Sequence, residues 1–300
     1  MTPDLLLLFL EQGVASGLVS GSVYALLALA IVMIFKAAEV PDFAQGDVFM
    51  AVGYVAFYLY ALRGAPAWLV VPATLLLAFA LLALFQAVVL RRVLAARGTQ
   101  VNLVIATLGL SYLLKGIVRN TGLGDTPRTL PALVSTASVQ VGQATLTWLD
   151  LTILAVAVIV LAAVFAMFAF TRTGRAMRAV GMNPRAARLV GIDLARMHAL
   201  VWGLSGLVSG VAVLLIAPKL LMTTDMGDIV TMGFAAAIIG GFTSLPGAVV
   251  GGLLIGIAEN LVGLFVSAQA MPLAPFLAIM LVLGLRPQGL FGGRPQQRKV

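Results

Sequence analysis

Polar and ionisable side chains interrupt long apolar stretches of this sequence at three places. Asp42, Gln45 and Asp47 lie within six residues of one another, whereas Lys115 and Glu259 each stand in an apolar run. Charged groups at membrane depth are costly and usually serve a function, such as lining a polar path. We therefore name Asp42, Gln45, Asp47 and Glu259 as candidate translocation-path residues. The alternatives are a simple interfacial turn for the first three, and snorkelling or a helix-to-helix hydrogen bond for Lys115 and Glu259.

Groups for enzymatic or metal chemistry are scarce. The chain has one histidine, His198, and no cysteine, so it offers neither a thiolate nor a histidine pair to hold a metal. It contains no G-x-x-x-x-G-K-[ST] loop, so ATP hydrolysis of the usual P-loop type would need another subunit. We expect no catalytic residue, no metal site and no cofactor. A membrane-embedded enzyme remains an alternative that any turnover by the chain alone would revive.

The composition places most of the chain in lipid. Of 300 residues, 61% are hydrophobic and only 10% are charged. Long uncharged runs favour transmembrane helices over a barrel, whose strands would alternate in polarity. The predicted fold class is all-α, a polytopic transmembrane bundle of eight or nine helices in a single domain over residues 1–300. The predicted spans are 12–35, 43–62, 67–90, 101–119, 148–170, 197–217, 231–243, 247–266 and 270–285, of which the 231–243 and 247–266 segments are predicted as either a broken hairpin or two crossings.

The lysines and arginines predict the orientation of the bundle, because positively charged loops stay in the cytoplasm. Fourteen of the 19 basic residues fall on one predicted side and four on the other. This distribution predicts a multi-pass membrane protein with a cytoplasmic C-terminus and an external loop over residues 120–147; the family resemblance described below implies that the membrane is the bacterial inner membrane. It also explains the net charge of +8 without a nucleic-acid partner.

The basic loop at 171–196 has a pattern that predicts structure. Asn183 and Pro184 form a helix N-cap and first-turn proline, Ala187 belongs to a short apolar face, and Gly191 is a helix stop. These signals predict a surface helix of about two turns that could couple the membrane helices to a cytoplasmic partner. An ordinary positively charged loop would explain the arginines but not the cap, the face and the stop together.

One pentapeptide occurs twice in the apolar segments. Gly17-Leu18-Val19-Ser20-Gly21 in the first predicted span recurs as Gly206-Leu207-Val208-Ser209-Gly210 in the sixth. In a nine-crossing arrangement these spans run in opposite directions, which suggests an inverted repeat. Small residues at this spacing also let helix backbones approach closely, so plain packing is the alternative explanation.

Several blocks of the sequence resemble the branched-chain amino-acid permease family of ABC importers. They occur in family order along essentially the whole chain, and they are specific as a set. The blocks are Gly17 to Leu26, Asp42 to Asp47, Gly174 to Ala179, Ala187 to Ile192, Gly240-Gly241, Ser244 to Ala248, and Leu285 to Gly292.

The resemblance implies a permease for branched-chain or related amino acids. Its implied partners are cytoplasmic ATP-binding subunits, a second permease subunit that is homologous or identical, and an extracytoplasmic substrate-binding protein. It also implies that the loop at 174–192, with Arg175 and Arg178, docks on the ATPase. Members of the family often have Asn, His and Glu where this chain has Asp42, Gln45 and Asp47. Because of this departure, an ABC permease for amides or urea remains an alternative. An ion-coupled secondary transporter is a separate alternative.

Overall fold

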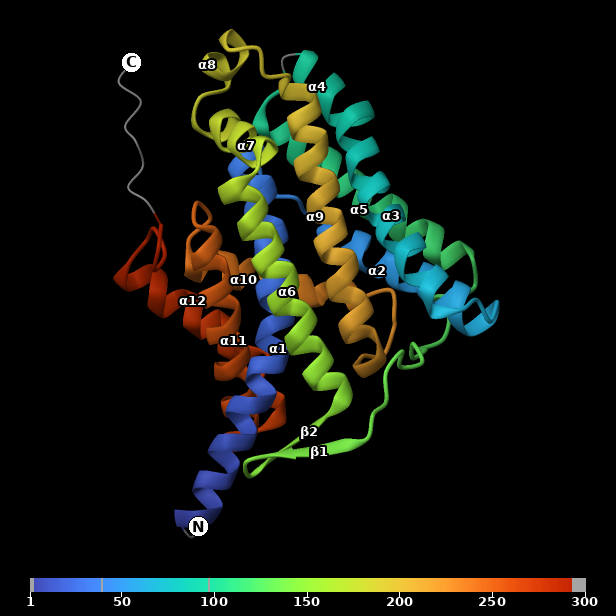
Figure 1. Cartoon of the computed structure of the whole chain (residues 1–300), viewed down its shortest axis with the longest axis vertical. Coiled ribbons are helices and arrows are strands. Elements are labelled where there is room, and N and C mark those ends of the chain that lie inside the picture. The colour runs from blue at the N-terminus through green and yellow to red at the C-terminus, as the bar shows by residue number, and fades with distance from the viewer. Residues whose placement is uncertain (1–2, 39, 97, 293–300) are drawn as a thin grey trace.

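The computed structural model describes residues 3–38, 40–96 and 98–292 as a bundle of helices with one small β-hairpin (Figure 1). Arg97 and the basic C-terminal residues Arg294, Arg298 and Lys299, which contribute to the predicted orientation, lie outside the described residues. The long elements are α1 (Pro3–Ala38), α3 (Ala67–Phe85), α5 (Gln100–Asn120), α6 (Trp148–Phe170), α9 (Leu194–Ile216) and α11 (Leu245–Phe265). The shorter elements are α2 (Gln45–Phe57), η1 (Tyr58–Leu62), η2 (Gln86–Leu90), α4 (Arg91–Ala95), β1 (Ser138–Val141), β2 (Ala144–Thr147), α7 (Arg172–Met182), α8 (Pro184–Leu189), η3 (Ala217–Lys219), η4 (Met226–Ile229), α10 (Val230–Gly240), η5 (Ala268–Ala270) and α12 (Leu273–Leu285).

The long apolar elements confirm a polytopic helical membrane protein. Within the described ranges, six stretches have the length and composition to cross a bilayer. They are Leu6–Ala38, Ala67–Ala95, Gln100–Asn120, Trp148–Phe170, Leu194–Lys219 and Leu245–Phe265. The other three predicted spans correspond to the shorter helices α2 with η1, α10 and α12, so nine helical segments match the nine predicted ranges. The segments predicted at 231–243 and 247–266 form a hairpin, α10 and α11, around the left-handed turn at Gly241.

The two copies of the glycine pentapeptide perform equivalent packing roles. In α1, a Cβ added at Gly17 would lie 2.6 Å from the Ile257 backbone of α11. In α9, a Cβ added at Gly206 would lie 2.3 Å from the Ala78 carbonyl of α3. The pairs α1–α11 and α9–α3 are therefore in backbone contact. This pairing is the one expected if α1 to α3 and α9 to α11 are inverted copies, and α1 and α9 run in opposite directions in Figure 1.

The second helix of each repeat, α2 or α10, begins inside the bundle. Gln45, at the start of α2, donates to the Ser209 hydroxyl at 2.5 Å, and Ser209 lies in the second half of α9. Asp47 accepts from Ser111, which lies midway along α5. Helix α10 is likewise short and follows a 3-10 turn. Broken helices of this kind are tolerated in membranes only where protein or water surrounds them.

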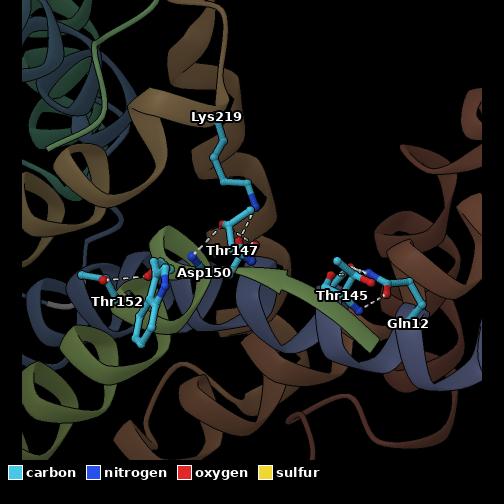
Figure 2. A network of polar contacts seen from close by, with 8 residues as sticks. Gln12, Thr145, Thr147, Asp150, Thr152 and Lys219 are labelled. Atoms are coloured by element: carbon cyan, nitrogen blue, oxygen red, sulfur yellow. Dashed lines mark hydrogen bonds and ion pairs between the residues drawn. The ribbon is translucent and has the colours of Figure 1, made fainter. Parts of the chain in front are cut away.

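A β-hairpin closes the end of the bundle where the chain begins (Figure 1), and the all-α prediction missed it. Strands β1 and β2 pair antiparallel across a two-residue turn that starts at Gly142, whose φ is +65°. The hairpin is fixed to α1, because Gln12 accepts from the Thr145 amide at 2.8 Å and donates to the Thr145 carbonyl at 3.2 Å (Figure 2). The predicted loop at 120–147 is thus partly ordered by a contact with the first helix.

The junction between β2 and α6 is held by Asp150, as Figure 2 shows. Its carboxylate accepts from the Thr147 amide at 2.9 Å in a capping box and also pairs with Lys219 of η3, just after α9. We expect Asp150→Ala to lower the free energy of unfolding by about 1–2 kcal/mol, mostly because the bonds from Thr147 to the Asp150 carboxylate in the capping box are lost. Thermal unfolding of the purified chain measures this.

The matched variant Lys219→Met removes only the ion pair of this junction. Because Lys219 is 39% exposed, the coupling between Lys219 and Asp150 in a double-mutant cycle should stay below about 1 kcal/mol. A larger coupling, or an Asp150→Ala variant as stable as the parent, would contradict this account of the junction.

Candidate functional site

The starts of the two short helices meet at a pair of glycines. A Cβ added at Gly46 would lie 2.6 Å from the Gly227 carbonyl oxygen, and a Cβ added at Gly227 would lie 2.6 Å from that of Gly46. The backbone of α2 therefore crosses the backbone of η4 with no room for any side chain. This crossing brings the beginning of α2 and the segment leading into α10 to one place in the bundle.

A charged group lies beside this crossing. Asp47 is 6% exposed; it accepts from Ser111 through Oδ2 and has Lys115 Nζ at 3.8 Å from Oδ1. The same Lys115 amine lies 3.6 Å from the carboxylate of Asp225. Among the described residues, Asp47 Oδ1 has no hydrogen-bond partner. The cluster thus joins α5 to both breaks and leaves a buried carboxylate oxygen that is only partly satisfied.

Asp47 and Lys115 line a cavity of about 500 Å3. The carboxylates of Asp47 and Asp228 and the amine of Lys115 contribute the charged part of its wall. The remaining wall is mostly apolar and aromatic, and its lining residues are Pro41, Phe43, Gly46, Gly227, Val230, Thr231, Phe234, Ile238 and Phe242. Phe43 stacks on Phe234 with ring centroids 5.8 Å apart, and Phe43 is 44% exposed. The cavity is therefore open at the surface of this chain.

Only one of the four candidate path residues lines this cavity. Asp42 is fully buried, with Oδ1 accepting from the Ala44 amide at 3.0 Å, and Gln45 is fully buried against Ser205 and Ser209 of α9. Both shape the break between α1 and α2, while Asp47 faces the cavity.

Glu259 lies elsewhere, in the contact between α1 and α11. Tyr24 donates to its Oε2 at 2.7 Å, and Glu259 is 9% exposed. This is the helix-to-helix hydrogen bond that the sequence analysis kept as the alternative, and it separates Glu259 from Asp47. The sequence analysis did not predict Lys115, Asp225 and Asp228 as charged neighbours of Asp47. The Gly227-Asp228 pair before an apolar helix was the one sequence feature that could have indicated them.

The basic loop at 171–196 folds as two short helices at the opposite end of the bundle from the hairpin (Figure 1). The Asn183 side chain accepts from the amides of Arg185 and Ala186 at 3.1 Å, which begins α8 at Pro184. Gly191, with φ +83°, ends it. The predicted cap, first-turn proline and stop are thus confirmed as local structure. Helix α7, capped by Thr171, precedes α8 and was not predicted.

The apolar face of α8 is divided between the inside and the surface. Ala187 is 3% exposed, whereas Leu189 is 89% and Val190 76% exposed. Arg175 and Arg178 of α7 are also exposed. The residues of this segment that a partner could contact are therefore Leu189, Val190 and the arginines, and Ala187 instead anchors α8 to the rest of the chain.

Helices that break inside a membrane bundle, and meet there around a charged cavity, define the membrane-spanning part of a transporter. The chain belongs to the family described as branched-chain amino acid transport system / permease component, whose match covers residues 13–284.

Similar proteins share the same length and extent. LivH of Escherichia coli (strain K12), a high-affinity branched-chain amino acid transport system permease protein, is 31% identical and aligns over 98% of each chain. BraD of Pseudomonas aeruginosa, which has the same description, is 28% identical over 96% of this chain and 97% of its own. A solved structure, PsaBC from Streptococcus pneumoniae in complex with Fab, has a TM-score of 0.45 at 17% identity, with 91% of this chain and 87% of that chain covered.

Proposed function

We propose that this chain is the permease subunit of an ABC importer and moves branched-chain or related apolar amino acids across the bacterial inner membrane. The observation that carries this proposal is the family match over residues 13–284. The relatives LivH and BraD, which align over nearly their whole length, are permeases for branched-chain amino acids. The chain does no chemistry of its own; it alternates access to the path as its partners open and close.

The partners follow from what the chain lacks and from its family. Because the sequence contains no P-loop motif, separate ATP-binding subunits supply the energy. A second permease subunit, identical or homologous, covers the open side of the cavity beside Phe43. An extracytoplasmic binding protein delivers the substrate to the hairpin end of the bundle.

The orientation follows from the basic residues. The six arginines between Arg172 and Arg196 belong to α7, α8 and the start of α9, at the end opposite the β-hairpin. Under the positive-inside rule that end faces the cytoplasm, together with the C-terminus, and the hairpin with the beginning of α1 faces outward.

The coupling segment transmits closure of the ATP-binding subunits to the membrane helices. Arg175, Arg178 and the exposed residues of α8 contact the ATPase, while Asn183, Pro184 and Gly191 fix the length of α8. Val180, which is 1% exposed, and Ala187 hold the segment against the bundle. A displacement of α8 is therefore passed to α9, which begins only five residues later.

Co-purification tests the proposal directly. The tagged chain is isolated from membranes in mild detergent, its partners are identified by mass spectrometry, and leucine uptake is measured in cells with and without those partners. Recovery of a P-loop ATPase that is required for uptake supports the proposal. Recovery of the chain alone, with uptake intact in cells that lack such ATPases, would favour a secondary transporter.

Glu259→Gln distinguishes ATP-driven import from ion-coupled transport, because it removes one ionisable carboxyl group and little else. An ion-coupled transporter needs an ionisable intramembrane group, and Glu259 is the carboxylate deepest in an apolar run. A glutamine keeps an oxygen that accepts from Tyr24, so we expect uptake within about twofold of the parent, a difference of less than about 0.5 kcal/mol. Initial rates of uptake measure it. A loss of uptake in this variant, at normal protein levels, would support ion coupling.

A further inference from the structure

The wall of the cavity beside Asp47 carries charges of both signs together with aromatic rings. Its acidic groups, Asp47 and Asp228, come from the two breaks, and its basic group, Lys115, comes from α5. Phe43, Phe234 and Phe242 form the apolar side, with Phe242 held in place by Phe35 at 4.7 Å between ring centroids. A ligand that matches this wall has an ammonium, a carboxylate and an apolar group.

We propose that this cavity is a recognition site for the zwitterionic end of an α-amino acid, with its apolar side chain packed against Phe43, Phe234 and Phe242. The proposal rests on the proposed function and deepens it. It assigns part of the substrate selectivity to the permease itself, at Asp47 and Lys115.

The carboxylate of Asp47 is the ammonium-binding group. It is 6% exposed, and its Oδ1 has no hydrogen-bond partner among the described residues although Lys115 lies 3.8 Å away. Oδ1 is itself buried in this conformation, so Asp47 attracts a substrate ammonium by its negative charge, and the ammonium supplies donors to Oδ1 once Lys115 turns away. Asp228, on the opposite break, adds negative charge to the same wall.

Lys115 is the carboxylate-binding group. Its amine is shared between Asp47 at 3.8 Å and Asp225 at 3.6 Å, and both distances are longer than a charge-assisted hydrogen bond. The amine can therefore turn to a substrate carboxylate without breaking a close pair.

The size and composition of the cavity agree with this ligand class. Its volume of about 500 Å3 lies in the range of about 300–1,000 Å3 that is typical of small-molecule sites. Urea or a short amide carries neither an ammonium for Asp47 nor a carboxylate for Lys115, and it has no apolar side chain to pack against the aromatic rings. A simple amine would leave Lys115 facing a second positive charge. The zwitterion satisfies both ends.

The test uses the purified assembly in lipid nanodiscs without the binding protein, so that the selectivity of that protein does not enter. Radiolabelled L-leucine is bound, and four unlabelled compounds compete with it: leucine, 3-methylbutylamine, 4-methylpentanoate and urea. The amine lacks the carboxylate of leucine, and 4-methylpentanoate lacks its ammonium. We expect each single-charge analogue to compete at least about tenfold more weakly than leucine, a cost of about 1.4 kcal/mol. Equal competition by an analogue, or preferential competition by urea, would overturn the ligand class.

Substitutions locate the site. Lys115→Met should weaken leucine binding at least about tenfold and abolish the preference for leucine over 3-methylbutylamine, while Lys115→Arg should restore part of it. Arg119→Met, on the same helix but exposed and outside the cavity lining, is the matched control and should bind as the parent does. Phe234→Ala keeps both charges and should reduce the preference for leucine over alanine. Unchanged binding and selectivity in both Lys115→Met and Phe234→Ala would refute the site.

The same assembly separates this inference from the proposed function. ATP hydrolysis stimulated by the loaded binding protein, and leucine uptake by the parent, report on the function alone. If both are present but Lys115→Met and Phe234→Ala bind as the parent does, the permease has this function and the cavity is not its recognition site. If no ATPase assembles with the parent and no uptake occurs, the proposed function itself fails.

Discussion

Leu189→Asp is expected to abolish most ATP-driven uptake while leaving the fold intact. Leu189 is 89% exposed in α8, so a charge there costs the isolated chain little. In the assembly, the same carboxylate would be buried against the ATP-binding subunit without a partner, which is strongly unfavourable. We expect at least about a tenfold loss of uptake, equivalent to about 1.4 kcal/mol, and reduced recovery of the ATPase with the tagged chain.

Two variants control this experiment. Leu189→Met keeps an apolar side chain of similar size and should retain uptake. Val141→Asp makes the same kind of change at an exposed position of the β-hairpin, where Val141 is 49% exposed, and should not affect recovery of the ATPase. Full uptake and full ATPase recovery in Leu189→Asp would remove α8 from the docking surface.

Gly46→Ala and Gly109→Ala are expected to change stability in opposite directions. A Cβ at Gly46 would lie 2.6 Å from the Gly227 carbonyl oxygen, and this neighbour is backbone that cannot swing aside. We expect Gly46→Ala to lower the free energy of unfolding by about 1–3 kcal/mol, as overpacking does elsewhere. At Gly109, in the middle of α5, no described atom beyond the adjoining residues and backbone of its own helix lies within 4 Å of the added Cβ, so alanine should stabilise the helix by about 0.5–1 kcal/mol.

Thermal unfolding of the two purified variants, in the same detergent, measures the difference. The pair controls itself, because both substitutions add one methyl group to a helical glycine. Because the crossing of Gly46 and Gly227 forms part of the cavity wall, Gly46→Ala should also reduce leucine binding. A Gly46→Ala variant that is as stable as Gly109→Ala would show that α2 and η4 are not in backbone contact.

Signals that lie close together in the chain were sufficient for the local structure. The cap at Asn183, the proline after it and the stop at Gly191 lie within nine residues, and α8 has these limits in the structure. The apolar segments were also predictable, because a helix in lipid satisfies its backbone within itself and needs no distant partner to form. The helical bundle and the places of its apolar segments therefore follow from the sequence.

The candidate site needed the tertiary structure. Asp47 and Ser111 are 64 residues apart in the chain, and Tyr24 and Glu259 are 235 residues apart. A sequence without its fold gives no reason to join Asp47 to Lys115 or to pair Glu259 with Tyr24. The sequence also could not show that Ala187 is buried. It belongs to the apolar face of α8, which made it a candidate for docking, but the fold turns it inward.

The sequence by itself determined the class of this protein, its membrane segments and the family to which it belongs. Composition, hydropathy and the residues that start and stop helices depend only on each residue and its near neighbours. They can therefore be assessed without knowing the fold. The tertiary structure decided which polar groups face one another, because that depends on where two broken helices cross. At that crossing Gly46 and Gly227 are in backbone contact, and their contact places Asp47 and Asp228 in the wall of one cavity.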